Sequence, residues 1–203
     1  TGVQTCALPI WSEPFGRGGF AAPYERLMFS RDVDYASAAC WLMRRADFDA
    51  LGGFAPDYAP AYFEDVDLAF RARKNGGRCR LVTSRPVIHD HSPPTTERMR
   101  MATRSREIFR GKWATELERQ PVRSLDRADC ARVRDHRCDE TRLVEISRRM
   151  PTAEAAAVID EAGLWAEAHP TSRMTVRVDR RPEVEGWRRK WCPRGLEIVI
   201  DPS

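Results

Sequence analysis

The sequence lacks the features that would assign it to a membrane-spanning, secreted or zinc-binding class. No apolar run approaches the roughly 18 residues that a membrane-spanning helix requires, and no secretion signal is visible. The six cysteines are scattered without Cys-x-x-Cys spacing, so the sequence indicates neither a zinc site nor a disulfide framework. A reducing cytoplasm fits this cysteine usage best, with Cys40 expected to be a small buried apolar residue.

The chain also has only a small excess of positive charge. Its 203 residues include 34 Lys and Arg against 30 Asp and Glu, and most of the net charge of +4 lies after Glu97. A basic surface can meet nucleic acid or an anionic membrane. Because acids are interleaved and no aromatic stacking platform accompanies them, a solvated charged face is favoured and no nucleic-acid partner is predicted. A polyanionic or lipid-diphosphate-linked acceptor near a membrane is the alternative.

What the sequence does contain is a tight cluster of carboxylates. Residues 62–67 read Tyr-Phe-Glu-Asp-Val-Asp, at the point where a loop runs into an amphipathic stretch that stops at 75–77, Asn-Gly-Gly. Asp65 is placed to cap this helix, and the helix dipole favours carboxylates that stay ionised there. An ionised, positioned carboxylate can act as a general base. The alternative is that these acids only cap the helix.

Hydrophobic patterning predicts helices and strands in alternation, an α/β class. A continuous apolar run at 35–43 is typical of a strand buried on both faces. Trp187 and Trp191, four residues apart, are interpreted as the packing face of a helix. The other expected elements are helices at 46–51, 66–74, 95–113 and 152–168, the last capped by Thr152, and strands at 78–83 continuing to 87–88, at 174–178 and at 196–201.

The motifs around the acidic cluster form a longer pattern. In chain order they are Val33-Asp34-Tyr35-Ala36-Ser37-Ala38-Ala39-Cys40-Trp41, Leu51-Gly52-Gly53-Phe54, Ala59-Pro60-Ala61-Tyr62-Phe63-Glu64-Asp65-Val66-Asp67 and Val87-Ile88-His89. This pattern resembles the C-terminal half of family 2 glycosyltransferases of the GT-A fold. The resemblance runs from about residue 31 to residue 113. It implies a partial GT-A (Rossmann-like) mixed sheet with flanking helices.

The resemblance also implies roles for individual residues. Asp65 would be the catalytic base that takes the proton from the acceptor hydroxyl, and Glu64 would orient the acceptor or the base. A metal-bound diphosphate would be contacted by His89, and His91 is a second metal candidate. The acceptor-binding positions implied in the same way are Gly52, Gly53, Phe54, Trp41 and Asp67.

The chemistry of sugar transfer asks for such a set. An inverting transfer needs a base near the attacking hydroxyl and positive charge on the leaving diphosphate, normally a divalent metal. The resemblance implies Mn²⁺ or Mg²⁺, a nucleotide-sugar donor and a glycan or lipid-linked glycan acceptor of polysaccharide or cell-envelope synthesis. It places the protein in the cytoplasm, with peripheral association at the inner face of the membrane.

The donor-binding half of a GT-A domain has no counterpart upstream of Val33. That half ends in an Asp-x-Asp metal motif. The sequence at 31–34, Arg-Asp-Val-Asp, contains this motif, but it directly precedes the run that aligns with a later strand of the family. The chain is therefore expected to be the acceptor-side half of an inverting transferase, inactive alone, with the metal held mostly by the missing half. The expected organisation is a non-native leader at 1–10, the transferase half at 11–113, a charged, partly helical linker at 114–150 and a small α/β segment at 151–203, which could begin a second domain.

Two other functional classes remain open on the sequence alone. A non-catalytic glycan-binding or scaffold remnant would use Gly52, Gly53 and Trp41 for packing and Asp65 only as a helix cap. A basic adaptor would bind nucleic acid or anionic lipid through the region after Glu97.

Overall fold

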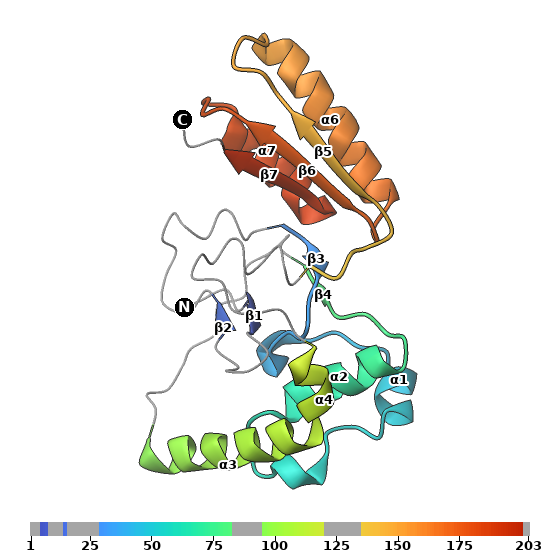
Figure 1. Cartoon of the computed structure of the whole chain (residues 1–203), viewed down its shortest axis with the longest axis vertical. Helices are drawn as coiled ribbons and strands as arrows, with labels where there is room; N and C mark the ends of the chain where they lie inside the picture. Colours follow the sequence, from blue (N-terminus) through green and yellow to red (C-terminus); the bar gives the residue numbers. More distant parts are fainter. Residues whose placement is uncertain (1–4, 8–13, 16–28, 83–94, 120–134, 201–203) are drawn as a thin grey trace. The chain divides into compact units, whose positions relative to one another are not determined.

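The computed structural model describes residues 5–7, 14–15, 29–82, 95–119 and 135–200, and the chain is divided into two compact units (Figure 1). Among the described residues, the first unit comprises 5–7, 14–15, 33–80 and 95–119, and the second comprises 29–32, 81–82 and 135–200. The units contain helices and sheets, and the predicted α/β class is confirmed.

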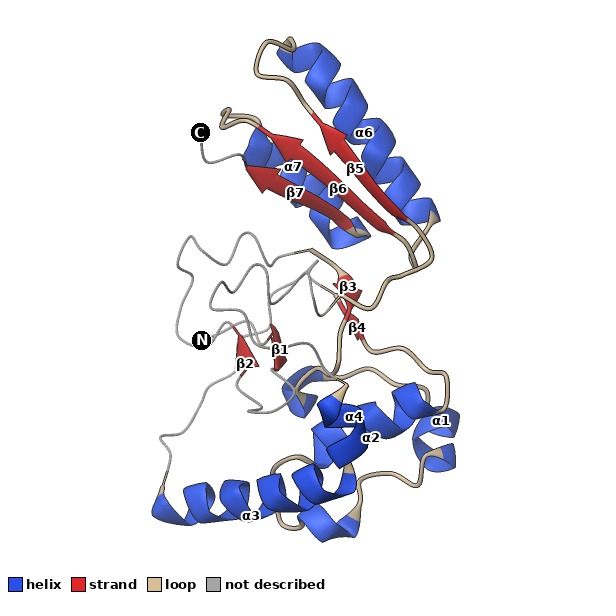
Figure 2. Cartoon of the chain, in the orientation of Figure 1, coloured by secondary structure: helices blue, strands red, loops and turns tan. Residues whose placement is uncertain are grey.

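The second unit is a regular alternation of strands and helices. Its elements in chain order are β5 (Thr141–Glu145), α6 (Thr152–Ala168), β6 (Arg173–Val178), α7 (Val184–Trp191), a 3-10 turn (Cys192–Arg194) and β7 (Leu196–Ile200). The strands form a parallel sheet in the order β5-β6-β7, in which Val144, Val176 and Ile198 are in register. Figure 2 shows both helices on the same side of this sheet, as expected of consecutive strand-helix-strand units.

The apolar pattern of the strands explains this arrangement. In β6, Met174, Val176 and Val178 are buried, whereas Thr175 and Arg177 between them are more exposed. Side chains of a strand alternate between the two faces, so one face of the sheet carries the core and packs on the helices. The predicted helix at 152–168 and the strands at 174–178 and 196–201 are confirmed within one residue, and Pro151 takes the N-cap position expected for Thr152.

The two helices of this unit meet at a glycine. A Cβ on Gly163 of α6 would lie 2.2 Å from the ring of Trp191 of α7, so only glycine leaves room for that ring. The Trp191 indole nitrogen donates to Asp160, also on α6, at 2.6 Å. Trp187 and Trp191 are both buried, which confirms the predicted packing face.

The first unit is mostly helical. Its elements are β1 (Thr5–Ala7) and β2 (Pro14–Phe15), which pair antiparallel, 3-10 turns at Ala38–Cys40 and Pro56–Tyr58, and the helices α1 (Arg45–Ala50), α2 (Glu64–Lys74), α3 (Thr96–Lys112) and α4 (Ala114–Glu118). Two short strands, β3 (Arg31–Asp32) and β4 (Arg80–Leu81), form a further two-stranded sheet, in which Arg31, Asp32 and Leu81 belong to the second unit. The predicted helices at 46–51, 66–74 and 95–113 are confirmed with small shifts at their ends.

Aromatic side chains form the core of this unit. The Phe70 ring of α2 lies 5.1 Å from that of Phe109 and 5.3 Å from that of Trp113, both with edge-to-face geometry. Phe63, just before α2, contacts Phe109 at 5.5 Å. These contacts fix α2 against α3, and therefore fix the position of the acidic residues at the start of α2.

Several sequence predictions are wrong or change in extent. The predicted strand at 35–43 is a 3-10 turn flanked by extended residues, and Cys40 is exposed rather than buried. The predicted strand at 78–83 is reduced to β4, and its continuation at 87–88 lies outside the described residues. Strand β5 lies in the stretch predicted as a linker, and it pairs with β6 of the C-terminal segment. Within the described part of the chain, no helix is long and apolar enough to cross a bilayer.

Candidate functional site

The acidic cluster begins with two residues in a conformation that side chains rarely adopt. Tyr62 and Phe63 have φ angles of 79° and 69°, in the left-handed region. Such residues cost on the order of 1–3 kcal/mol each and are kept only where the surroundings hold them. Phe63 is held by burial in the aromatic core. Phe63, and not the predicted Asp65, takes the N-cap position, so Glu64 and Asp65 are the first two residues of α2.

The carboxylate of Asp65 is anchored by main-chain amides. Its Oδ2 accepts a hydrogen bond from the Ala38 N–H at 3.1 Å, and its Oδ1 accepts one from the Val66 N–H at 2.8 Å. Ala38 is presented by the 3-10 turn that Ser37 caps through its side-chain oxygen. The apolar run that was predicted as a strand therefore supplies a donor to the acid cluster.

Burial raises the pKa of Asp65 above its ordinary value, although the hydrogen bonds from Ala38 and Val66 act in the opposite direction. Burial therefore opposes the ionised state that the helix dipole favours at this position. A carboxylate with a raised pKa is a stronger proton acceptor once it is ionised. Asp65 is thus fixed in position, and its carboxylate is a stronger proton acceptor than that of an ordinary aspartate.

Glu64 lies beside Asp65 and has one oxygen without a partner. Its Oε2 is buried and makes no hydrogen bond to the protein. Burial raises the pKa of Glu64, and the neighbouring charge of Asp65 raises it further. Since buried polar atoms are nearly always paired in folded proteins, this oxygen is suited to accept a hydrogen bond from a bound ligand.

Asp67 has a different environment. Its carboxylate is completely buried. Four donors surround it: the Tyr58 hydroxyl at 3.2 Å and Trp113 Nε1, Lys112 Nζ and Arg71 Nε, each at 2.8 Å. Burial alone would raise the pKa of Asp67, but the bonds from Lys112, Trp113 and Arg71 hold it below the usual value. The acceptor-binding role predicted for Asp67 conflicts with this burial, because no surface of its carboxylate is left for a ligand.

Arg71 connects this buried carboxylate to the Gly-Gly-Phe turn. Besides Asp67, its guanidinium donates to the carbonyl oxygen of Leu51 and, at 2.7 Å, to that of Gly53. Gly52 and Gly53 have φ angles of 78° and 65°, as the helix-ending turn requires. The predicted turn therefore exists, and α2 holds it in place through Arg71.

The remaining predicted acceptor residues lie in the same unit. Phe54 is 45% exposed and packs its ring edge-to-face on Phe48 at 5.5 Å. Trp41 is partly buried against the aromatic core, three residues after the Ala38 amide that holds Asp65. Phe54 has a surface that a ligand could contact, whereas Trp41 also contributes to packing.

The predicted metal ligands His89 and His91 lie outside the described residues. In the part of the chain that the structure describes, no group of three or more His, Cys, Asp or Glu side chains could hold a metal ion. In the Asp-x-Asp sequence at 31–34, the Asp34 side chain is buried and pairs with Arg73 at 3.0 Å, so it is not available as a ligand.

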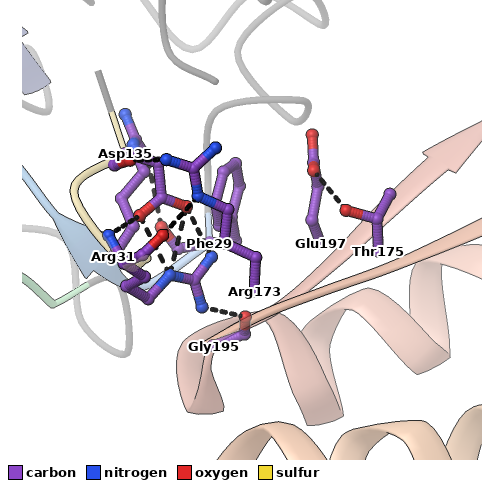
Figure 3. Close-up of polar contacts among 8 residues, drawn as sticks. Phe29, Arg31, Asp135, Arg173, Thr175, Gly195 and Glu197 are labelled. Atoms are coloured by element: carbon purple, nitrogen blue, oxygen red, sulfur yellow. Dashed lines mark hydrogen bonds and ion pairs between the residues drawn. The ribbon is translucent and has the colours of Figure 1, made fainter. Parts of the chain in front are cut away.

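The second unit contains a separate cluster of buried charges (Figure 3). Arg137 donates to the Asp135 carboxylate at 2.7 Å and to the carbonyl oxygen of Gly195 at 2.6 Å, and its guanidinium lies over the Phe29 ring. Arg173 donates to the carbonyl oxygens of Arg137 and Asp135. These guanidinium groups are engaged by oxygens of the protein itself, which is typical of a structural network that ties loops to a sheet.

Sequence reasoning missed Tyr58, Arg71, Lys112 and Trp113. One signal was present: Asp67 and Arg71 are four residues apart on one helix face, the spacing of an ion pair. The other three reach Asp67 from two other segments, Tyr58 from the 3-10 turn before α2 and Lys112 and Trp113 from the end of α3, which no local pattern indicates.

Comparison with curated proteins gives a partial match. The chain is 37% identical over 95 residues to the N-acetylglucosaminyl-diphospho-decaprenol L-rhamnosyltransferase of Mycobacterium tuberculosis, in the strains CDC 1551 / Oshkosh and ATCC 25618 / H37Rv. The match covers 46% of this chain and 30% of each relative. No family model and no solved structure matches the chain. The chain is therefore homologous, over part of its length, to a glycosyltransferase.

Proposed function

We propose that this chain carries the acceptor-side half of an inverting family 2 glycosyltransferase, with Asp65 as its general base. The observation that supports this most is the Asp65 carboxylate, which two main-chain amides fix at the start of α2 and whose pKa burial raises. The partial similarity to a rhamnosyltransferase supports the reaction class.

In this mechanism Asp65 accepts the proton of the acceptor hydroxyl while the hydroxyl oxygen attacks the anomeric carbon of the donor sugar. The bond from that carbon to the diphosphate oxygen breaks on the opposite face, so the configuration inverts and the nucleotide diphosphate leaves. Glu64 accepts a hydrogen bond from the acceptor through its unpaired Oε2 and so orients it. A divalent metal, Mn²⁺ or Mg²⁺, would neutralise the leaving diphosphate when bound. His89 and His91 are the residues proposed to contact it.

For the substrates, we propose a nucleotide-sugar donor and a lipid-linked glycan acceptor. The name of the mycobacterial relative specifies a decaprenol-linked acceptor and rhamnose as the transferred sugar. An acceptor of that class would place the protein at the cytoplasmic face of a membrane. The donor-binding half would be supplied by sequence outside the matched region, which covers only 30% of the relative.

The test replaces the corresponding part of the relative by residues 31–113 of this chain and measures sugar transfer by the chimera. Replacing Asp65 by Asn should lower kcat about 10²- to 10⁴-fold, the usual contribution of a general base, with the fold retained. The matched control is Asp57→Asn, which neutralises an exposed carboxylate in the 3-10 turn Pro56–Tyr58 and should leave kcat unchanged. Undiminished transfer by Asp65→Asn would contradict the proposal.

The second candidate is a glycan-binding scaffold in which Asp65 only anchors the 3-10 turn. The hydrogen bond between Asp65 and the Ala38 amide favours this scaffold, because that bond alone would account for an aspartate at this position. A folded chimera that transfers no sugar, combined with a loss of stability in Asp65→Asn, would support this alternative.

A further inference from the structure

The net charge of the chain is concentrated in one helix. The whole sequence has 34 Lys and Arg and 30 Asp and Glu, and α3 alone contains six of the former and two of the latter. The rest of the chain is therefore balanced at 28 of each. The cations of α3 are Arg98, Arg100, Arg104, Arg106, Arg110 and Lys112, and its acids are Glu97 and Glu107.

The first half of α3 is not packed into the unit. Residues 96–100 are all exposed, and the buried residues of the helix are only Ser105 and Phe109, in its second half. Met99 is an exposed apolar side chain at 54% exposure, between Arg98 and Arg100. Figure 1 shows this end of α3 projecting from the other helices of its unit. The helix therefore offers solvent a basic surface with an apolar residue in it.

The residue types of this surface favour a phospholipid surface over single-stranded nucleic acid. Binding of single-stranded nucleic acid relies on aromatic side chains that stack on bases. The one aromatic residue of α3, Phe109, is buried in the core. Arginine together with an exposed methionine suits a phospholipid surface, where cations meet anionic headgroups and an apolar side chain enters the interface.

The surface is also connected to the loop that leads into the acidic cluster. Ser105 Oγ donates to the carbonyl oxygen of Ala61 at 3.2 Å, and Arg104 donates to that of Ala59 at 3.2 Å. A membrane bound by the exposed half of α3 is thus one helical turn from the loop that orients Glu64 and Asp65. That placement suits an acceptor whose lipid tail stays in the bilayer.

We propose that α3 is the surface through which this protein docks on membranes rich in anionic phospholipid. This inference deepens the proposed function and rests on that function only for the identity of the acceptor. The docking surface itself is inferred from the charge and exposure of α3. Each arginine near an anionic bilayer contributes roughly a fivefold gain in binding, so the affinity should fall steeply with salt.

The test is cosedimentation of this chain with vesicles of phosphatidylglycerol and phosphatidylcholine, compared with phosphatidylcholine alone. The double variant Arg98→Glu/Arg100→Glu, which changes the two arginines on either side of Met99, should lower binding to the anionic vesicles at least about tenfold. The matched control is Arg44→Glu/Arg45→Glu at the start of α1, which makes the same charge change on side chains that are 85% and 86% exposed. Each of these four arginines lies within four residues of a carboxylate, and circular dichroism checks that both variants stay folded.

Three outcomes would overturn the docking surface. They are equal binding to both vesicle types, equal losses in the α3 and α1 variants, and salt-dependent binding of duplex DNA that only the α3 variant loses. Asp65→Asn should bind vesicles as the unmodified chain does. If the chain does not bind the vesicles but the chimera transfers sugar, this inference is rejected and the proposed function stands. If the chain binds the vesicles but the Asp65→Asn chimera transfers sugar at an undiminished rate, the proposed base is rejected and the docking surface stands.

Discussion

The two units of the chain bury charge in different places. In the second unit the Arg137–Asp135 pair lies before β5 in the chain and bonds to Gly195, just before β7, outside the strands that carry the apolar core. In the first unit Asp67 is inside the core, and two of its partners, Tyr58 and Trp113, are themselves core residues. The comparison shows that apolar pattern organises the second unit, whereas a buried ionic network organises the candidate site.

Removing the buried charge of the first unit should have the largest effect on stability. Asp67→Asn leaves Arg71 and Lys112 without their carboxylate, and breaking a buried pair in this way costs about 3–5 kcal/mol. Hydrogen exchange with peptide mapping should show faster exchange in α2 and α3 and little change in β6 and β7.

The control for this change is Asp49→Asn on α1. Asp49 and Arg45 form an ion pair at the same four-residue spacing, but the Asp49 side chain is 54% exposed. Exposed pairs of this kind contribute about 0.3–0.5 kcal/mol. If Asp49→Asn and Asp67→Asn destabilised equally, the contrast between the units would not hold.

In the second unit, an added side-chain methyl group in the core should lower stability instead. Gly163→Ala places a Cβ 2.2 Å from the buried Trp191 ring, and overpacking of this type costs about 1–3 kcal/mol. Thermal unfolding should show a lower Tm, with faster hydrogen exchange in α6 and α7. Gly186→Ala in α7 meets nothing within 4 Å and should stabilise the same unit by about 0.5–1 kcal/mol. A stabilising Gly163→Ala would refute the packing argument.

Lowering the pH should destabilise the first unit more than the second, with a smaller effect than the substitutions above. Because the folded-state pKa of Asp67 is lowered, its contribution is complete above the ordinary aspartate pKa, about 4, and is lost as the pH falls through the folded value. The pKa of Asp160 in the second unit is also lowered, by Lys190 and Trp191, but its side chain is 43% exposed and solvent screens the pair. Protection factors, which correct for the slower intrinsic exchange in acid, should therefore fall first in α2 between pH 6 and pH 3, and Asp67→Asn should remove that dependence.

The smallest effect is expected at the start of α3. The Thr95 hydroxyl oxygen accepts a hydrogen bond from the Arg98 N–H at 3.2 Å, and losing an N-cap costs about 1 kcal/mol. Thr95→Ala should therefore speed exchange in residues 96–100 without changing α6. Unchanged exchange there would mean that the cap contributes little to the helix.

The elements that the sequence predicts well are those whose structure is determined by residues close to one another in the chain. Helix α6 and strands β6 and β7 follow from the period of their apolar residues, and the sequence predicts them closely. The turn at Gly52 and Gly53 is equally local, because glycine adopts positive φ without strain.

The start of α2 could not be predicted, because its geometry depends on distant residues. Two adjacent aromatic residues with positive φ contradict local preference and exist only because Phe63 packs on Phe109 of α3. The burial of Asp67 has the same origin, since Lys112 and Trp113 are more than 40 residues away in the sequence. The strand predicted at 35–43 failed because that run gives its Ala38 amide to Asp65 instead of to a sheet.

One stripe of α3 is in register with the loop and helix that carry the site. Ser105, Phe109 and Lys112 contact Ala61, Phe63 and Asp67 in that order, four and then three residues apart. Inserting a single residue between 105 and 109 would turn Phe109 and Lys112 by about 100° and break two of the three contacts together. An insertion before Ser105 leaves all three intact. Length changes in α3 are therefore tolerated on one side of Ser105 and excluded on the other, although none of these residues takes part in the chemistry.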